Sequence, residues 1–349
     1  GSYNDDKGVN TPNIGEGMIP IKWNGSSWVE TTVNDPDWYD YTAKKWANAK
    51  TSDGSMWVWI PRYAYSITSG YHSSSAGNIE VEFMKGLTNE TSTGRKSFNN
   101  ASGQGKWNIH PAFNYGQTVS GIWVAKFEAS PEGATTNPSN SEYDGTGKKL
   151  QVKPGVSSWR SITISNIYDV CKNYNSALNS HMMKNDEWGA VAYLSKSKYG
   201  KNAEVDINSD SSYYTGGGSG NAYVTNVGQS TTGTVHGVYD MSGGAYEYVA
   251  AYVDNGNSNL TKYGSSLVNG ESKTKNMYSK GSTDNRENNY STNSGKYGDA
   301  VYETGENGSD IGSWYYDFSY FPYTWSPFFY RGGNLSDGKI AGVFNFVYI

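Results

Sequence analysis

Residues 313–349 read SWYYDFSYFPYTWSPFFYRGGNLSDGKIAGVFNFVYI, and fourteen of these 37 residues are Phe, Trp or Tyr. Ser, Asp and Asn are interleaved with them. A core segment would not mix aromatic with so many small polar residues, and a catalytic segment would carry more titratable groups. Tyr and Trp give large contact area at little entropic cost, while Ser, Asn and Gly adapt their hydrogen bonds. The composition therefore predicts an exposed binding surface, with core-facing strands as the alternative.

Two short stretches predict a rigid frame within this segment: RGG at 331–333 and AGVF at 341–344. Glycine permits turns and close approach of the backbone. Side chains alternate between the two faces of a strand, so Phe344 and Phe346 are expected to face the core. The side chains expected to point to solvent are Tyr330, Asn334, Leu335, Ser336, Asp337, Asn345 and Val347.

Length, charge and aromatic content indicate whether the chain folds and whether it can bind nucleic acid. The chain has 349 residues, enough for one large domain or two ordinary ones. Its net charge is −5 and only 17% of its residues are charged, so there is no basic stripe for binding nucleic acid. Mean hydropathy is −0.70, yet 12 Trp, 30 Tyr and 10 Phe can supply a core. We therefore expect a folded protein without a nucleic-acid partner.

A single cysteine, Cys171, excludes a disulfide framework or a cysteine-based zinc site within one chain. It is expected to be a small buried residue on a helix. No run of 18 apolar residues occurs, so no membrane span is predicted. The opening pair, Gly1-Ser2, is typical of a cloning remnant, which leaves room for a signal or anchor upstream.

The chain divides into three expected parts. Residues 1–16 predict a tag and linker, residues 17–50 a short strand-forming segment, and residues 51–349 the main domain. Strands are expected at 19–23 and 27–31, joined by an Asn24-Gly25 turn, and at 56–61 and 120–128. Long Gly-, Ser- and Asn-rich loops are expected at 70–106, 209–220 and 255–305.

Two stretches predict amphipathic helices. Ser165 is the expected N-cap of the first, whose apolar residues recur three or four positions apart as far as Leu178. Asn185 is expected to cap the second, residues 186–195, whose acidic first turn suits the helix dipole. Two helices among short strands and long loops predict an α+β domain.

Residues 237–249, GVYDMSGGAYEYV, resemble the G-L-Y-D-M-x-G-N-V-W-E-W-V signature of formylglycine-generating-enzyme-like domains, a branch of the C-type lectin fold. Further stretches resemble other elements of this family and lie in its order: 56–61, His110-Pro111, 121–128, 185–190 and 329–333. The resemblance covers about residues 51–349 and implies a C-type lectin-like domain.

The pattern F-F-x-R-G-G-x-x-x-x-G-x-x-A-G-V-F-x-F at 328–346 is similar to the variable region of proteins diversified by retroelements, known from bacteria, phages and gut viromes. That resemblance implies a variable region at 313–349, changed by error-prone reverse transcription at adenines, mostly in AAC codons. Trp325 cannot arise from an AAC codon in this way, although an AAG codon could give rise to it. The implied ligand-binding residues are Tyr316, Asp317, Tyr320, Tyr323, Trp325, Ser326, Tyr330, Asn334, Leu335, Ser336, Asp337, Ile340, Asn345 and Val347.

The resemblance implies a non-enzymatic display protein outside the cell, on a bacterial surface or phage particle. Its ligand would be a protein or glycan on a host or neighbouring cell. No cofactor is expected, although some relatives bind structural calcium near the signature. Here Gly244-Ala245 replaces the family's Asn-Val, which weakens that expectation. Glu247 is instead expected to be a buried, hydrogen-bonded structural carboxylate.

Two other functions remain open. A structural subunit of a pilus or phage tail would use the same domain to pack against its neighbours. An oxidase like the formylglycine generator needs a copper-binding cysteine pair, and Cys171 stands alone. The related sulfoxide synthases use three histidines around iron, but the four histidines here show no metal-binding spacing. His110, before a proline, is expected to be structural.

Overall fold

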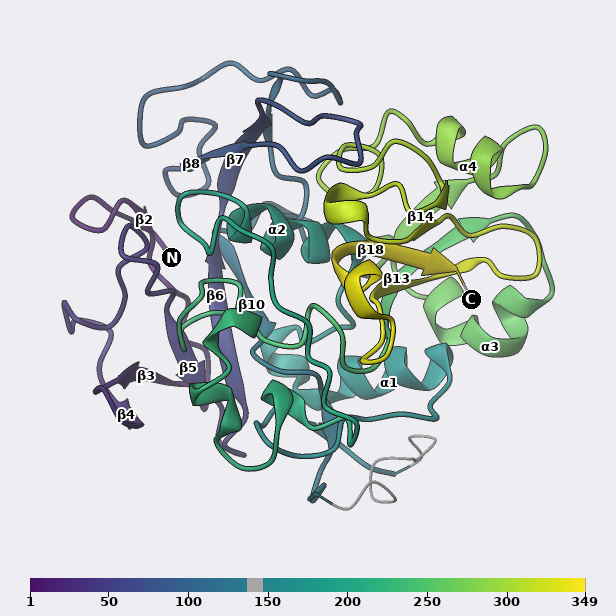
Figure 1. Cartoon of the computed structure of the whole chain (residues 1–349). Coiled ribbons are helices and arrows are strands. Elements are labelled where there is room, and N and C mark those ends of the chain that lie inside the picture. Colours follow the sequence, from purple (N-terminus) through teal and green to yellow (C-terminus); the bar gives the residue numbers. More distant parts are fainter. Residues whose placement is uncertain (137–146, 349) are drawn as a thin grey trace.

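The computed structural model describes residues 1–136 and 147–348, and it has a mixed α+β fold (Figure 1). One large antiparallel sheet lies in the N-terminal half. Its strand order is β10-β6-β5-β3-β4, and the order along the chain is β3 (Ile19–Trp23), β4 (Trp28–Glu30), β5 (Asn48–Lys50), β6 (Met56–Pro61) and β10 (Gly121–Ala125). The predicted hairpin and both predicted apolar strands are therefore confirmed, with slightly different ends.

The C-terminal half forms a six-stranded mixed sheet of order β14-β13-β17-β18-β16-β15. Its strands are β13 (Glu247–Asp254), β14 (Asn276–Ser279), β15 (Ser309–Asp310), β16 (Ser319–Tyr320), β17 (Phe328–Gly332) and β18 (Gly342–Tyr348). β13 and β14 are parallel, as are β16 and β18, and the other pairs are antiparallel. This sheet brings the end of the signature stretch, residues 247–249 in β13, beside the RGG strand, β17.

Three smaller sheets complete the strands of the described ranges. They are formed by β7 (Tyr63–Ile67), β8 (Ile79–Phe83) and β9 (Trp107–Ile109), by β1 (Tyr3–Asn4) with β2 (Val9–Asn10), and by β11 (Ser130–Pro131) with β12 (Leu150–Gln151). The β1–β2 hairpin occupies the expected linker. Val9 and Asn10 are buried, and the Asn10 side chain donates to the carbonyls of Gly86 and Ser120 at 3.1 and 3.0 Å. Residues 1–16 are thus packed against the domain.

The described residues contain four α-helices, two more than predicted. They are α1 (Ile164–Tyr174), α2 (Asn185–Ser195), α3 (Asn259–Val268) and α4 (Arg286–Thr292). Thr163, not Ser165, caps α1, with its hydroxyl accepting from the Asn166 N–H at 3.3 Å. At the start of α2, the Glu187 carboxylate accepts from the backbone N–H of Lys184 at 2.8 Å. The expected loop 255–305 contains α3, α4 and β14.

The core has three parts. One is a cluster of Ile21, Met56, Phe127, Leu150, Val152, Tyr223 and Tyr239. The other two position the six-stranded sheet. The larger lies between the sheets and around α2, every residue of which is buried. The smaller lies where α1 and α3, side by side in Figure 1, cover one face of β13 and β17. There Ile164 and Leu260 pack with Phe328. The six-stranded sheet is therefore anchored by α2 on one face and partly covered by α1 and α3 on the other.

Candidate binding site

The inward side chains of β17 and β18 form the predicted frame. Phe344 and Phe346 are buried, as expected from strand alternation, and Arg331 is fully buried between Phe346 and Trp188 of α2. The Arg331 guanidinium donates to Asn185 Oδ1 at 2.7 Å and to the carbonyls of Asp299 and Ala300, both at 2.9 Å. Burial lowers its pKa to about 10. Arg331 thus ties β17 to α2 and to the segment before β15.

The glycines of the frame are required by space and by conformation. Gly333 has φ +74°, a region favoured by glycine, and a Cβ there would lie 2.7 Å from Ala341 Cα. A Cβ at Gly342 would overlap the carboxylate of Asp317. The two stretches RGG and AGVF therefore hold β17 and β18 in close backbone approach.

Two predicted binding residues belong to this frame, which corrects the prediction. Asp317 is 1% exposed because its Oδ2 accepts from the Phe344 N–H at 3.1 Å, in the space left by Gly342. Asn345, expected to point to solvent, is 0% exposed because its amide donates to the Ile340 carbonyl at 3.1 Å. Neither side chain is available to a ligand.

The signature stretch also contributes a buried carboxylate that links separate segments of the chain. Asp240 is buried, and its carboxylate accepts from Asn208 Nδ2 at 3.0 Å, from the Gly216 N–H at 2.9 Å and from the Glu128 N–H at 3.0 Å. Burial raises the pKa of Asp240 to about 6. Asp240 thereby joins the end of β10 to the loop before β13.

Three aromatic residues with partly exposed rings lie around Arg286 of α4, and the exposed Trp325 ring lies beside one of them, 6.1 Å from Tyr323. We call these four residues the aromatic edge: Tyr320, Tyr323, Trp325 and Tyr348. The centroid of the Tyr348 ring lies 5.9 Å from that of Tyr320 and 5.2 Å from that of Tyr323. The Arg286 guanidinium lies 4.8 Å from the Tyr320 centroid and 5.5 Å from that of Tyr323. These contacts position the rings before any ligand arrives.

A second aromatic group lies on the face of β17 that also carries Phe328. The Tyr330 ring packs 4.8 Å from Tyr246 and 4.4 Å from Tyr248, and the Tyr246 hydroxyl donates to Asp337 at 3.0 Å. Val347 is paired with Tyr330 across the strands. Apart from the two buried residues, the predicted binding residues are exposed or half-buried: Tyr316, Tyr320, Tyr323, Trp325, Ser326, Tyr330, Asn334, Leu335, Ser336, Asp337, Ile340 and Val347. Ile349, the end of the predicted variable region, lies outside the described residues.

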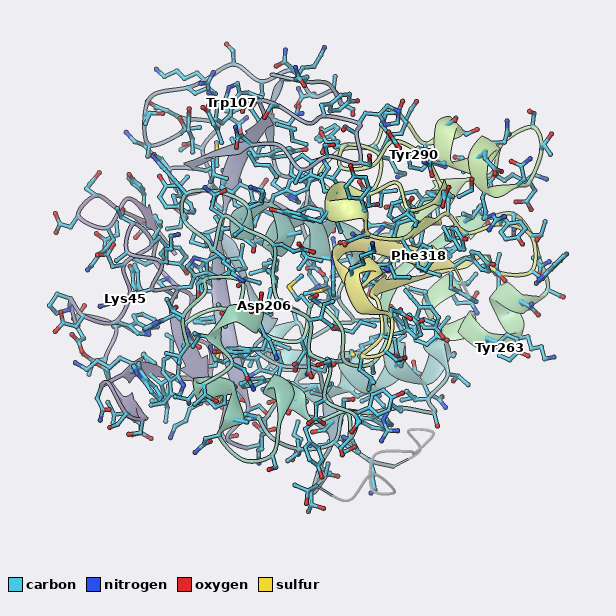
Figure 2. The ribbon with its side chains drawn as sticks, in the orientation of Figure 1. Lys45, Trp107, Asp206, Tyr263, Tyr290 and Phe318 are labelled. Atoms are coloured by element: carbon cyan, nitrogen blue, oxygen red, sulfur yellow. The ribbon has the colours of Figure 1, made fainter. Side chains whose placement is uncertain are left out.

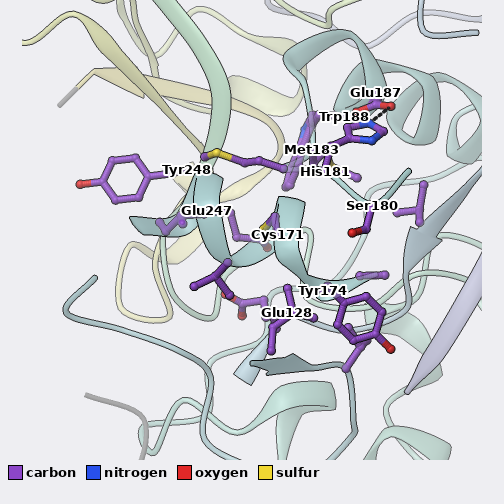
Figure 3. A pocket seen from close by; sticks show the side chains of 18 of the residues that line it. Glu128, Cys171, Tyr174, Ser180, His181, Met183, Glu187, Trp188, Glu247 and Tyr248 are labelled. Carbon is purple, nitrogen blue, oxygen red and sulfur yellow. Dashed lines mark hydrogen bonds and ion pairs between the residues drawn. The ribbon is translucent and has the colours of Figure 1, made fainter. Parts of the chain in front are cut away.

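Sequence reasoning missed a large hollow beneath α1, with a volume of about 1330 Å³ (Figure 3). Its lining is mainly apolar and includes Cys171 of α1 with Met182 and Met183. It is formed by segments far apart in the chain, so no local pattern could have indicated it. Tyr246, Tyr263 and Trp325, which are 38%, 43% and 65% exposed, also line it. Figure 2 shows Tyr263 on α3, at the periphery of the molecule.

Titratable side chains lie at two places in the lining of the hollow. In Figure 3, Glu128 and Glu247 lie on one side of Cys171, and the His181–Glu187 pair lies on the other. His181 Nε2 lies 2.8 Å from the Glu187 carboxylate, and its Nδ1 lies 2.8 Å from the Asn179 carbonyl. Both ring nitrogens therefore face acceptors, which a protonated imidazole satisfies. Burial lowers the pKa of His181, but the charge and hydrogen bond of Glu187 outweigh it and raise the pKa overall.

Glu247 only partly matches the expected structural carboxylate. Burial raises its pKa well above the usual range, but its Oε1 has no hydrogen-bond partner among the described residues. Glu128, its neighbour, is buried and accepts from the Ala245 N–H at 3.3 Å. A Cβ at Gly244 would overlap Glu128 Oε1. Gly244 thus makes room for a second carboxyl group beside Glu247.

Few side chains in the described ranges are suited to redox chemistry or to binding a metal ion. Burial raises the pKa of Cys171 to about 12, which keeps its thiol protonated. Burial lowers the pKa of His110 to about 3, and its Nδ1 accepts from the Ala112 N–H at 3.1 Å, as a structural histidine would. No group of three or more His, Cys, Asp or Glu residues able to hold a metal ion occurs in residues 1–136 and 147–348.

A scan against protein-family models and a search of curated proteins found no match to this chain. In the part of the chain that the structure describes, no helix is long and apolar enough to cross a membrane.

Proposed function

We propose that this protein is a non-enzymatic ligand-binding protein whose C-terminal surface recognises a protein or glycan outside the cell. The observation that carries the proposal is the separation, within one segment, of buried frame residues from partly exposed aromatic ones. Arg331 and Phe346 are buried, whereas Trp325 is 65% exposed. Such a surface offers large, pre-positioned aromatic area to a partner.

The same separation supports variability of the surface. Exposed side chains away from buried contacts change stability by little, so they can be exchanged without unfolding the domain. Tyr316, Trp325 and Ser336 are exposed and lie in the proposed variable region, 313–349. The resemblance to retroelement-diversified proteins of the C-type lectin fold supports this further, although Asp317 and Asn345 belong to the frame.

Binding is tested with glycan and bacterial-surface-protein arrays. The full chain and a variant with Tyr320→Ala, Tyr323→Ala and Trp325→Ala are applied to the same arrays. A matched control carries Tyr263→Ala and Met277→Ala, which remove two exposed apolar side chains outside the segment. We expect targets bound by the full chain and the control but lost from the variant. Targets bound equally by all three proteins, or no target at all, would overturn the proposal.

Diversification has a separate test in the coding locus. We expect a near-copy of the bases that encode 313–349, differing at adenines, beside a gene for a reverse transcriptase. A locus without such a copy would refute the diversification and leave the binding proposal to the arrays.

A further inference from the structure

We propose that the aromatic edge receives an acidic side chain, Asp or Glu, of a partner protein, and that Arg286 of α4 binds its carboxylate. The inference rests on the recognition function proposed above and specifies the chemistry of one contact within it. Arg286 lies outside residues 313–349, so exchange of residues in that segment leaves the charged group in place.

The first argument is the charge of Arg286. Its guanidinium carbon lies 4.8, 5.5 and 5.9 Å from the ring centroids of Tyr320, Tyr323 and Tyr348. Across residues 1–136 and 147–348 this half-buried side chain forms neither an ion pair nor a hydrogen bond. Ring contacts stabilise a cation but leave the five N–H donors of a guanidinium without acceptors. A partner that supplies an acceptor therefore meets donors that the fold does not use.

Acidic residues of the adjoining segments have contacts of their own. The Asp284 carboxylate accepts from two asparagine side chains at 2.7 and 3.0 Å and from a backbone N–H at 3.1 Å. Asp310 accepts from the next backbone N–H at 2.8 Å. Glu287 is exposed, and hydrogen bonds with a serine side chain and with its own backbone lower its pKa more than the charge of Arg286 does. In the described part of the chain, none of the three lies within ion-pair distance of Arg286.

The second argument is the set of hydroxyl groups on the same rings. Within the described ranges, the hydroxyls of Tyr320, Tyr323 and Tyr348 have no hydrogen-bond partner, and the three rings are half-buried. Each hydroxyl can donate one hydrogen bond, and an ionised carboxylate can accept about four. Arg286 and these hydroxyls are thus a group of donors without an internal acceptor. Such a group favours an anionic ligand over a cationic or a purely apolar one.

The third argument is the fit between a held guanidinium and a carboxylate. The Tyr348 ring is stacked on Tyr320 at 16° and lies nearly perpendicular to Tyr323, at 88°. These ring contacts, together with those to Arg286, restrict all four side chains before binding, so less conformational entropy is lost when a partner arrives. A guanidinium presents its donors as a planar fork that matches the two oxygens of a carboxylate. A carboxylate is therefore the anion that this group fits.

The fourth argument concerns the source of the carboxylate. Trp325 is 65% exposed and lies 6.1 Å from Tyr323, so it adds apolar contact area beside the charged group. Trp, Tyr and Arg are the residue types that dominate binding energy at protein–protein interfaces, where surrounding contacts exclude water from the central ones. The carboxylate therefore belongs to a protein side chain, and an acidic sugar is the competing source.

The inference is tested with a phage-displayed library of random peptides of about 12 residues, selected on the full chain. Selected peptides are synthesised with each Asp changed to Asn and each Glu to Gln, and affinities are measured by calorimetry. We expect one acidic residue whose amide replacement weakens binding about tenfold or more. The affinity of the acidic form should also fall as salt rises from about 50 to 500 mM, because salt screens the charges. Selected peptides without such a residue, or the recovery of no peptide, would overturn the inference.

Variants place the contact at Arg286. To Arg286→Gln, the acidic peptide and its amide form should bind equally, because the charge that distinguishes them is gone; loss of ring packing alone would weaken both forms alike and keep their ratio. The matched control is Lys198→Gln, which removes an exposed cation beside the Tyr199 ring, outside the aromatic edge, and should keep the tenfold difference.

Arg286→Lys replaces the Gln variant if that variant does not fold or binds no peptide. It keeps the charge but loses the planar fork, so it should reduce the difference between the two peptide forms without abolishing it. A difference that persists undiminished in the Arg286 variant would refute the placement.

The combined Tyr320→Ala, Tyr323→Ala and Trp325→Ala variant separates this inference from the recognition function. Peptides that this variant loses, but that the full chain and Arg286→Gln bind equally, would overturn the inference and leave the recognition surface standing. Peptides that the combined variant binds as well as the full chain does would count against both. Arrays of oligogalacturonates address the competing source: binding to them that depends on Arg286, without any acidic peptide, would overturn the assignment to a protein.

Discussion

Helices α1 and α2 have the same length, 11 residues, but they are packed in different ways. Every residue of α2 is buried, whereas α1 buries only Ile164 and Tyr168. α2 lies in the core between the sheets, whereas α1 packs partly against the two smaller core clusters and partly borders the hollow. The difference shows that an amphipathic pattern predicts which face of a helix turns inward, but not how completely neighbouring side chains fill the space against that face.

The largest expected difference between the two helices is in stability after truncation. Leu194→Ala in α2 should lower the free energy of unfolding by about 2–5 kcal/mol, because Leu194 is fully buried and leaves a cavity. Ile167→Ala in α1 should cost about 1 kcal/mol, because its side chain already borders a space. Chemical denaturation of both variants measures this. Equal losses would show that the hollow is closed in solution.

A buried carboxyl in contact with α2 should give a pH-dependent difference. Glu303 accepts from Tyr193 of α2 at 2.9 Å and from Tyr65 at 2.7 Å, and burial raises its pKa to about 7. Since the folded pKa is above the unfolded value of 4.5, this contribution to stability is complete below pH 4.5 and is lost as the pH rises through about 7. Glu303→Gln, neutral throughout, should therefore gain about 3 kcal/mol relative to the unmodified chain between pH 4.5 and 8.

Denaturation at both pH values measures that gain. Glu80→Gln, which removes an exposed carboxyl of β8, is the matched control for loss of surface charge. A difference between Glu303→Gln and the unmodified chain that does not change with pH would contradict the raised pKa.

Sequence reasoning found the elements whose signals are local. The strand at Met56–Pro61, the frame of β17 and β18 and the approximate positions of α1 and α2 follow from apolar periodicity and from glycine. Burial of Asp317 could not be predicted, because it depends on an absent side chain at Gly342. α3 and α4 were missed because they lie in a polar stretch, where tertiary packing outweighs weak local preference.

The candidate site was also predicted only in part, because its remaining features depend on tertiary packing and not on a local sequence pattern. Alternation along β18 correctly placed Phe344 and Phe346 inward, but Asn345 is also buried because the 3-10 helix Gly338–Ile340 folds over it. Neither alternation nor helical periodicity describes the space between elements. The hollow, which depends on how α1 is seated above distant strands, therefore had no counterpart in the sequence pattern.

A smaller difference is expected when the same enlargement is made in each helix. Val191→Phe in α2 should cost about 1–3 kcal/mol, because the larger ring is forced into a packed core. Val170→Phe in α1 should change stability by less than about 1 kcal/mol, because Val170 lines the hollow and the ring can enter it. Thermal and chemical unfolding compare the two. A larger cost at Val170 would mean that the space beneath α1 is already filled.

The smallest change in stability is expected at the mouth of the hollow. Trp325→Ala should alter the free energy of unfolding by no more than about 0.5 kcal/mol, because the side chain is 65% exposed. Trp314→Ala, in the same aromatic segment, should cost about 3–5 kcal/mol, because Trp314 is fully buried and its indole donates to the Gly70 carbonyl at 2.9 Å. Denaturation curves for the pair provide the measurement. A comparable loss at Trp325 would make that ring part of the scaffold, and the residues free to contact a partner would then be fewer than the aromatic edge contains.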